Sequence, residues 1–344
     1  PDVSWQKTTM KNIGLDFYLL SDRISGSFDF FRNDITRLLG YASTSPLAIY
    51  ETRPINGGHY YRRGWELMVD TKNLVGEFTW DTSLTFSKTN SFWKERLPNY
   101  DYQIYQQREN EPMSAYYYYN VTGIINTDRS NMPESQKTLQ AEAQLPGCPI
   151  IEDKNKDGKI DENDVYMKDN SPAIYVGIGN TFTYKRFEFS FFMYGQFGIQ
   201  KYNIAYSAAQ AGPLAVDYPE NSNKFAYRLW NSQTNPNGSR PGLAIGKMGA
   251  LPGNAWVNAD RENASFMRMR NITLAYNLAG NILGSLQRYV RNIKVYVDAQ
   301  NPFILTKFQG FDPEIYTGGG GASGGSRGEY PQTRTFSLGA NITF

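Results

Sequence analysis

Apolar and polar side chains alternate residue by residue over several segments of this chain. In the segment 336–344 every even-numbered residue is apolar, and every odd-numbered residue is Ser, Gly, Asn or Thr. Successive side chains of a strand point to opposite faces, so a period of two predicts β-strands with one apolar face. Strong and weak versions of the pattern predict nine strands, at 10–20, 23–38, 61–72, 78–87, 174–184, 187–198, 264–277, 293–300 and 336–344.

The links between these strands alternate in length, and this points to a particular kind of β protein. Outer-membrane barrels pair tight periplasmic turns with long extracellular loops, whereas a β-sandwich has no such requirement. The pattern therefore favours an all-β fold, a transmembrane antiparallel β-barrel. The short links are 21–22, 73–77 and 185–186, the long ones are 39–60, 88–173, 199–263 and 306–332, and 278–292 is intermediate with an expected helical turn at Leu286–Val290.

The number of predicted strands is odd, although bacterial single-chain barrels have an even number. An open sheet would also leave two unpaired edges in lipid, where backbone groups need partners. We therefore expect the chain to be part of a larger barrel, with Pro1 on the extracellular side and the last strand running to the periplasm. No basic, apolar leader opens the sequence at residues 1–5, so the N-terminal part of the protein is expected to lie outside it.

Composition agrees with a membrane strand protein and argues against other classes. Aromatic residues make up 15% of the chain and charged residues 20%, which is rich in rings and poor in charge for a soluble domain. No apolar run approaches the roughly 18 residues that a membrane helix needs. The formal net charge is only +2 and the charges are dispersed, so no nucleic-acid surface is expected.

The sequence from 153 to 164 fits the register of an EF-hand calcium loop. Oxygen-bearing side chains occupy positions one, three, five and nine, a glycine occupies position six, and an acid occupies position twelve. The acid at twelve is Asp164, where EF-hands have glutamate. Without metal the segment would be an acidic turn. The expected ligands of a structural Ca²⁺ are the side chains of Asp153, Asn155, Asp157, Asp161 and Asp164 and the backbone carbonyl of Lys159.

Aromatic side chains gather in the same long link. Flat rings stack on sugar faces and on peptide backbones, so they are candidates for a substrate cavity; alternatively, they pack the loop into a compact lid. Both interpretations are open from the sequence. The candidates are Trp93 and the run Tyr116, Tyr117, Tyr118 and Tyr119.

Catalytic chemistry has little support in the sequence. Cys148 is the only cysteine and His59 the only histidine, so an intrachain disulfide and a multi-histidine metal site are excluded, and His59 is expected in the loop 39–60. No Gly-x-Ser-x-Gly or His-Glu-x-x-His motif is present. We expect no enzymatic activity, with a barrel that hydrolyses glycans as a minor alternative.

Several motifs along the whole chain point to one family. They include Pro-Asp-Val-Ser-Trp-Gln-Lys-Thr at the start, Gly-Trp-Glu-Leu at 64–67, Asn-Ile-Thr-Leu at 271–274, Gly-Phe-Asp-Pro-Glu at 310–314 and the terminal Phe344. Together with the Asp-x-Asn-x-Asp-Gly loop, these motifs resemble the SusC/RagA family of TonB-dependent outer-membrane receptors.

The resemblance implies the C-terminal part of a 22-strand barrel, about nine strands of it, with a plug domain, a TonB box and upstream strands elsewhere in the protein. It implies import of an oligosaccharide or oligopeptide across the outer membrane of a Gram-negative, Bacteroidetes-type bacterium. The implied partners are TonB, outer-membrane lipid and a SusD-like surface lipoprotein. The competing class is a secreted, Ca²⁺-dependent carbohydrate-binding β-sandwich.

Overall fold

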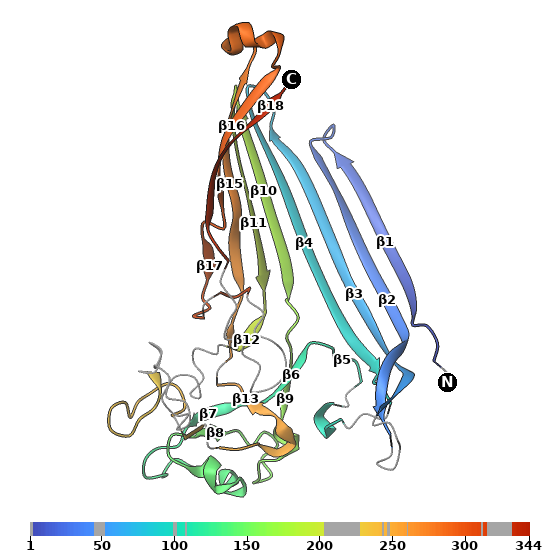
Figure 1. Cartoon of the computed structure of the whole chain (residues 1–344). Coiled ribbons are helices and arrows are strands. Elements are labelled where there is room, and N and C mark those ends of the chain that lie inside the picture. The colour runs from blue at the N-terminus through green and yellow to red at the C-terminus, as the bar shows by residue number, and fades with distance from the viewer. Residues whose placement is uncertain are drawn as a thin grey trace.

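The computed structural model shows one curved antiparallel sheet whose long strands follow each other in chain order (Figure 1). It describes residues 3–44, 52–98, 102–106, 109–202, 228–242, 244–245, 248–259, 261–310, 312–314 and 332–344. The order along the sheet is β1 (Lys7–Leu19), β2 (Ile24–Ser43), β3 (Thr52–Leu74), β4 (Phe78–Glu95), β10 (Ile174–Tyr184), β11 (Phe187–Phe197), β15 (Phe266–Ala279), β16 (Asn292–Gln300) and β18 (Thr335–Thr343).

Each of these nine strands overlaps one of the predicted strands, so the period-two prediction is confirmed. The short links are confirmed as well, since only a few residues separate β1 from β2, β3 from β4 and β10 from β11. The intermediate link contains the 3-10 segment η9 (Gly280–Arg288), which begins earlier than the expected helical turn. The sheet is open, with β1 and β18 at its two edges.

The prediction of a long loop at 39–60 is wrong. β2 continues to Ser43 and β3 begins at Thr52, and these two residues are paired. Arg37 and Gly58 both have positive φ, 58° and 73°, between the paired positions on either side of them, and interrupt the regular pleat. The alternation is lost there although the pairing continues, so His59 lies in β3 rather than in a loop.

The start of the long link at 88 is also too early. β4 runs to Glu95, and its residues 88–95 pair with β3 as far as His59. The alternation fades after Lys88 because both faces of β4 carry polar side chains over the next residues. Parts of the other two long links, 203–227 and 315–331, lie outside the described residues.

The two faces of the sheet differ in polarity, as the alternation predicts. Side chains of register partners share a face. Among the described residues nothing covers the apolar face, since Leu274 is 45% exposed, Val297 49% and Leu338 83%. One row of partners on the apolar face is Trp80, Phe182, Phe189, Leu274, Val297 and Leu338, and the adjacent row on the polar face is Asp81, Thr181, Ser190, Thr273, Asp298 and Ser337.

An apolar face without a second sheet packed on it contradicts the β-sandwich alternative, in which the same side chains would form a core between two sheets. Within the described residues, no helix has the length and apolar character needed to cross a membrane. The tight turns, η9 and the C-terminus lie at one end of the sheet, and most of the smaller elements lie at the other (Figure 1).

The smaller elements belong mainly to the long links after β4 and β11. β17 (Ile304–Thr306) pairs with β15, and β5 (Glu111–Pro112) pairs with β4. The others are η1 (Ile104–Gln106), β6 (Ala115–Tyr119), β7 (Val121–Ile124), η2 (Glu134–Thr138), η3 (Ala141–Gln144), β8 (Pro149–Ile151), η4 (Glu162–Asp164), β9 (Tyr166–Asp169), β12 (Gln200–Tyr202), η8 (Pro252–Asn254), β13 (Trp256–Val257) and β14 (Arg261–Asn263).

Candidate functional site

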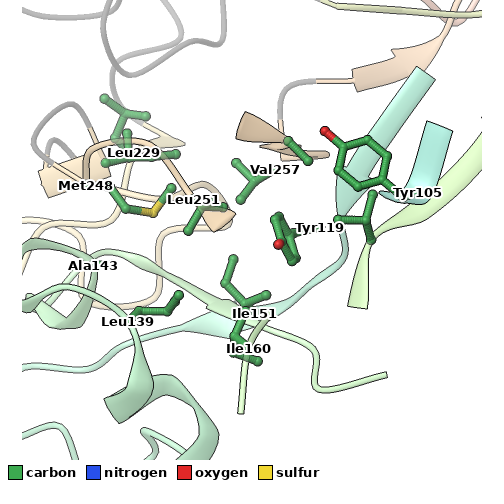
Figure 2. Close-up of a cluster of buried hydrophobic side chains, with 13 residues drawn as sticks. Tyr105, Tyr119, Leu139, Ala143, Ile151, Ile160, Leu229, Met248, Leu251 and Val257 are labelled. Carbon is green, nitrogen blue, oxygen red and sulfur yellow. The ribbon is translucent and has the colours of Figure 1, made fainter. Parts of the chain in front are cut away.

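The two long links fold together at one end of the sheet, and we call their described residues from 96 to 173 and from 228 to 263 the loop module. Their shared core draws buried side chains from both links (Figure 2). The parallel pairing of β13 with β6 joins the same two links through their backbones. The buried side chains include Tyr105, Tyr119, Leu139, Ile151, Ile160 and Val165 from the first link, and Leu229, Ile245, Met248, Leu251 and Val257 from the second.

The four consecutive tyrosines divide between the two faces of β6. Tyr119 has no exposed surface, and its hydroxyl lies 3.0 Å from the backbone carbonyls of Asp161 and Pro252. Burial raises the pKa of the Tyr119 phenol above its usual range. Tyr117 packs beside the same core, with its ring 4.9 Å from that of Tyr105. These two rings therefore pack within the loop module.

The other two tyrosines form a stacked series, which we call the aromatic ladder, with Tyr166 of β9. The ring of Tyr118 lies 5.3 Å from that of Tyr116 and 5.7 Å from that of Tyr166. The Arg261 guanidinium lies 3.7 Å from the centre of the Tyr116 ring, and Lys154 Nζ lies 4.8 Å from that of Tyr166. The ladder therefore carries a cation at each end, and its rings are partly exposed.

Trp93 belongs to a different group of side chains at the end of β4. Its ring meets the Tyr60 ring edge-on at 6.0 Å, and the Arg96 guanidinium lies 5.2 Å from its centre. Arg96 also forms an ion pair with Glu111, whose side chain is fully buried. The structure thus separates Trp93 from the aromatic ladder, although the sequence grouped them as one candidate set.

The segment 153–164 forms a compact turn held by contacts from side chains to backbone. The carboxylate of Asp153 accepts the amide hydrogens of Gly158 at 2.9 Å and of Asp157 at 3.2 Å. Gly158 has a φ of 87°, and nothing lies within 4 Å of where its Cβ would be. The glycine at position six thus provides the positive φ that the calcium-loop register predicts.

Asp164, the acid at position twelve, closes the turn from within. Its side chain is fully buried, and it accepts the amide hydrogens of Lys154 and Asp161, each at 2.9 Å. Hard oxygen donors of this kind suit Ca²⁺ by their chemistry. In the described residues, however, no three His, Cys, Asp or Glu side chains are gathered as a metal site. In this structure the carboxylates of Asp153 and Asp164 accept backbone amide hydrogens.

Known proteins match this chain over its full length, although at low identity. No known family profile matches the chain. It is 28% identical over its full length to the TonB-dependent receptor SusC of Bacteroides thetaiotaomicron, of which it covers 32%. It is 25% identical over its full length to the TonB-dependent receptor P3 of Formosa agariphila, of which it covers 34%.

The chain is similar along its whole length to TonB-dependent receptors of the SusC type. Solved structures of the RagAB peptide importer share its fold: the closed-closed state matches with a TM-score of 0.73 at 19% identity, covering the whole chain and 36% of the solved one. The open-open state matches with a TM-score of 0.71 at 20% identity and covers 35%. This SusC-like chain spans about a third of the length of the curated relatives it matches. It lies in the outer membrane of a Bacteroidetes-type Gram-negative bacterium.

Sequence reasoning missed one buried ionic cluster of the SusC-like chain. Arg268 of β15 donates to both carboxylate oxygens of Asp312, at 2.7 and 2.8 Å, and its Nε contacts Glu314. Asp312 also accepts the amide hydrogen of Gln332, at 3.2 Å. Asp312 therefore ties both ends of the segment between 314 and 332 to the barrel wall. The Gly-Phe-Asp-Pro-Glu motif at 310–314 marks the acids of this cluster in the sequence. Its spacing does not indicate that Arg268 is their partner.

Proposed function

We propose that this chain forms part of the wall and the extracellular loops of an importer that moves a large nutrient across the outer membrane. The observation that carries the proposal is the sheet with one uncovered apolar face and one polar face. Such a sheet suits a wall between lipid and a wet interior. The full-length similarity to receptors named TonB-dependent supports the same role, and none of the names describes an enzyme.

We further propose that the nutrient is an oligosaccharide or an oligopeptide, that TonB powers the import, and that a SusD-like lipoprotein covers the loop end. The resemblance to SusC and to the RagAB peptide importer supports these assignments. The aromatic ladder of Tyr116, Tyr118 and Tyr166 is the part of the loop module best suited to contact such a substrate. Its rings are partly exposed, and a cation lies at each end of the stack.

Purification of the full-length receptor from outer membranes tests this function most directly. We expect that detergent is required for extraction, that a surface lipoprotein copurifies, and that mass spectrometry finds a retained oligosaccharide or oligopeptide. Cells that carry Tyr116→Ala together with Tyr118→Ala should take up the identified nutrient more slowly than cells with Tyr289→Ala, which removes an exposed ring directly after η9. A receptor that stays soluble and monomeric without detergent would overturn the proposal.

We also propose that the segment 153–164 binds a structural Ca²⁺. The side chains of Asp153, Asn155, Asp157, Asp161 and Asp164 and the carbonyl of Lys159 would hold the ion, in the register that the sequence predicts. Bound calcium would supply positive charge among carboxylates that now accept backbone hydrogens. At about one hundred times its Kd, calcium would stabilise the loop by about 2.7 kcal/mol.

Hydrogen exchange of amides 154–164 in the full-length receptor, with Ca²⁺ or with EGTA, checks this prediction. Calcium should slow exchange in the natural protein and have no effect in Asp157→Ala. Asp128→Ala is the matched control, because Asp128 lies in the same link but outside the loop and should leave the calcium effect unchanged. Identical exchange of the natural protein in Ca²⁺ and in EGTA would rule the site out.

A further inference from the structure

A groove of about 600 Å³ crosses the loop module away from the aromatic ladder. It lies between β7 and the segment from Trp230 to Pro241, so both long links contribute to its walls. Its volume is within the range of about 300–1,000 Å³ that is typical of ligand sites. Neither the calcium prediction nor the substrate candidates taken from the sequence include it.

The lining is polar but free of negative charge. Of the described residues that line the groove, none is acidic, and the one cation, Arg240, pairs with Glu262 at 3.4 Å and contacts the carbonyl of Ala259. Each amide side chain offers donors and acceptors together, whereas a lysine or a carboxylate offers only one kind. Apart from Arg240 and Trp230, the polar side chains that line the groove are amides and hydroxyls, namely those of Thr122, Asn126, Asn131, Asn237, Ser239 and Asn258.

Two of these amides are held in place from β7. The Asn258 carbonyl accepts the amide hydrogen of Val121 at 3.2 Å, and its NH₂ donates to Asn120 at 3.0 Å. The Asn131 NH₂ donates to the backbone carbonyl of Ile124 at 2.8 Å. An amide has two hydrogens and two lone pairs, so each keeps a further donor and acceptor for a ligand. These groups are oriented before any ligand arrives.

The indole of Trp230 is fixed in a similar way. A Cβ at Gly147 would lie 2.7 Å from Cε3 of the ring, and one at Gly242 would lie 3.3 Å from it. The backbone amide of Trp230 donates to the Arg240 carbonyl at 2.8 Å. The edge of the ring therefore rests against two glycines. An indole held at its edge gives the groove a rigid, flat apolar element.

We propose that this groove binds a segment of a neutral oligosaccharide. Sugar hydroxyls both donate and accept, which matches side-chain amides, and the C–H face of a sugar ring matches an indole. A charged polymer would find no complementary partner, because the lining carries no free acid and its arginine is already paired. The groove adds a capture site to the proposed importer and narrows its substrate class, so its role in uptake rests on the proposed function.

Binding by the full-length receptor in detergent tests the groove separately from import. The probes are maltohexaose, cellohexaose, xylohexaose and mannohexaose as neutral glycans, hexagalacturonate as an acidic one, and an uncharged Gly-Ser octapeptide. The readouts are calorimetry and tryptophan fluorescence. We expect that at least one neutral hexasaccharide binds and that neither the acidic glycan nor the peptide competes with it.

Variants then place that binding in the groove. Asn237→Ala and Trp230→Ala should each raise the Kd about tenfold or more, which corresponds to about 1.4 kcal/mol. Trp230→Phe should bind more tightly than Trp230→Ala, because it keeps an aromatic ring at this position. It also shows whether the fold of the groove tolerates a substitution at 230. Gln233→Ala is the matched control, since Gln233 is exposed on the same segment but does not line the groove.

Three results would overturn the inference: no neutral glycan binds, the peptide or hexagalacturonate binds in its place, or neutral glycan binding is unaffected by Asn237→Ala and Trp230→Ala. None of these results depends on transport. A receptor that imports a nutrient without binding glycans here would keep the proposed function and lose only the groove. Glycan binding in the groove by a receptor that imports nothing would keep the groove and overturn the proposed function.

Discussion

At the residue scale, buried polar groups determine how the loop module holds together. The Tyr119 hydroxyl reaches one carbonyl from each of the two links, at Asp161 and at Pro252. The Cys148 thiol is buried and donates to the carbonyl of Glu142 at 3.3 Å. Water cannot replace these partners inside a packed core, so removing one of them costs more than a surface contact would.

Tyr119→Phe should destabilise the loop module by about 1–3 kcal/mol, because the two carbonyls lose their donor inside the core. Hydrogen exchange of the peptides around 158–165 and 250–257 measures the effect, and both should exchange faster. Tyr118→Phe, in the same strand but on the other face, is the control and should leave exchange unchanged. Equal exchange in both variants would show that the buried hydroxyl does not join the two links.

Cys148 should resist alkylation in the folded receptor. Burial raises the pKa of its thiol to about 11, so at pH 8 only about one molecule in a thousand carries the reactive thiolate. Reaction with iodoacetamide should be slow at pH 8 and should speed up by orders of magnitude on unfolding. Ser232→Cys in a Cys148→Ser background provides an exposed thiol for comparison. Equal rates at the two positions would mean that the loop core is open to water.

At the element scale, the alternation of the sequence predicted strands well wherever the pleat is regular. It failed at Arg37 and Gly58, where two positive-φ residues interrupt the pleat and hide the continuing β2–β3 pairing. In β15, Arg268 and Ile272 are both even-numbered, so strict alternation would place a charged and an apolar side chain on the same face. The register shift opposite Phe192 and Met193 leaves Arg270 without a register partner in β11, so Arg268 lies on the polar face and Ile272 on the apolar face. A single sequence does not reveal such local irregularities.

The protease resistance of the link between β17 and β18 should depend on the ion pair between Arg268 and Asp312. Removing one partner of a buried ion pair costs about 3–5 kcal/mol when the other charge is left without compensation. Arg268 keeps Glu314 as a second partner, so the cost of losing Asp312 should be smaller. Asp312→Ala should therefore release Gln332 and Glu314 and make the 306–332 link more sensitive to protease. Limited proteolysis of the full-length receptor measures this, with Asp298→Ala on the wall as a control. Unchanged cleavage of the link would contradict its anchoring by Asp312.

At the scale of the whole molecule, the sequence predicted the sheet and its polarity but not the loop module. Alternation and link length are local properties, so they carry information about strands and turns. The loop core joins residues such as Tyr105 and Val257 that lie far apart in the chain, and no local pattern announces such contacts. For the same reason the groove beside Trp230 and the split of the tyrosines between two faces became visible only in three dimensions.

The central claim is that one face of the sheet contacts lipid while the other faces water. Spin labels at Val297→Cys and Asp298→Cys, each in a Cys148→Ser background of the full-length receptor in bilayers, test it directly. These neighbours in β16 belong to the apolar and polar rows respectively. We predict that the label at 297 is relaxed mainly by oxygen, which concentrates in lipid, and the label at 298 mainly by a water-soluble nickel complex. Equal accessibility at both positions, or the reverse order, would contradict the account.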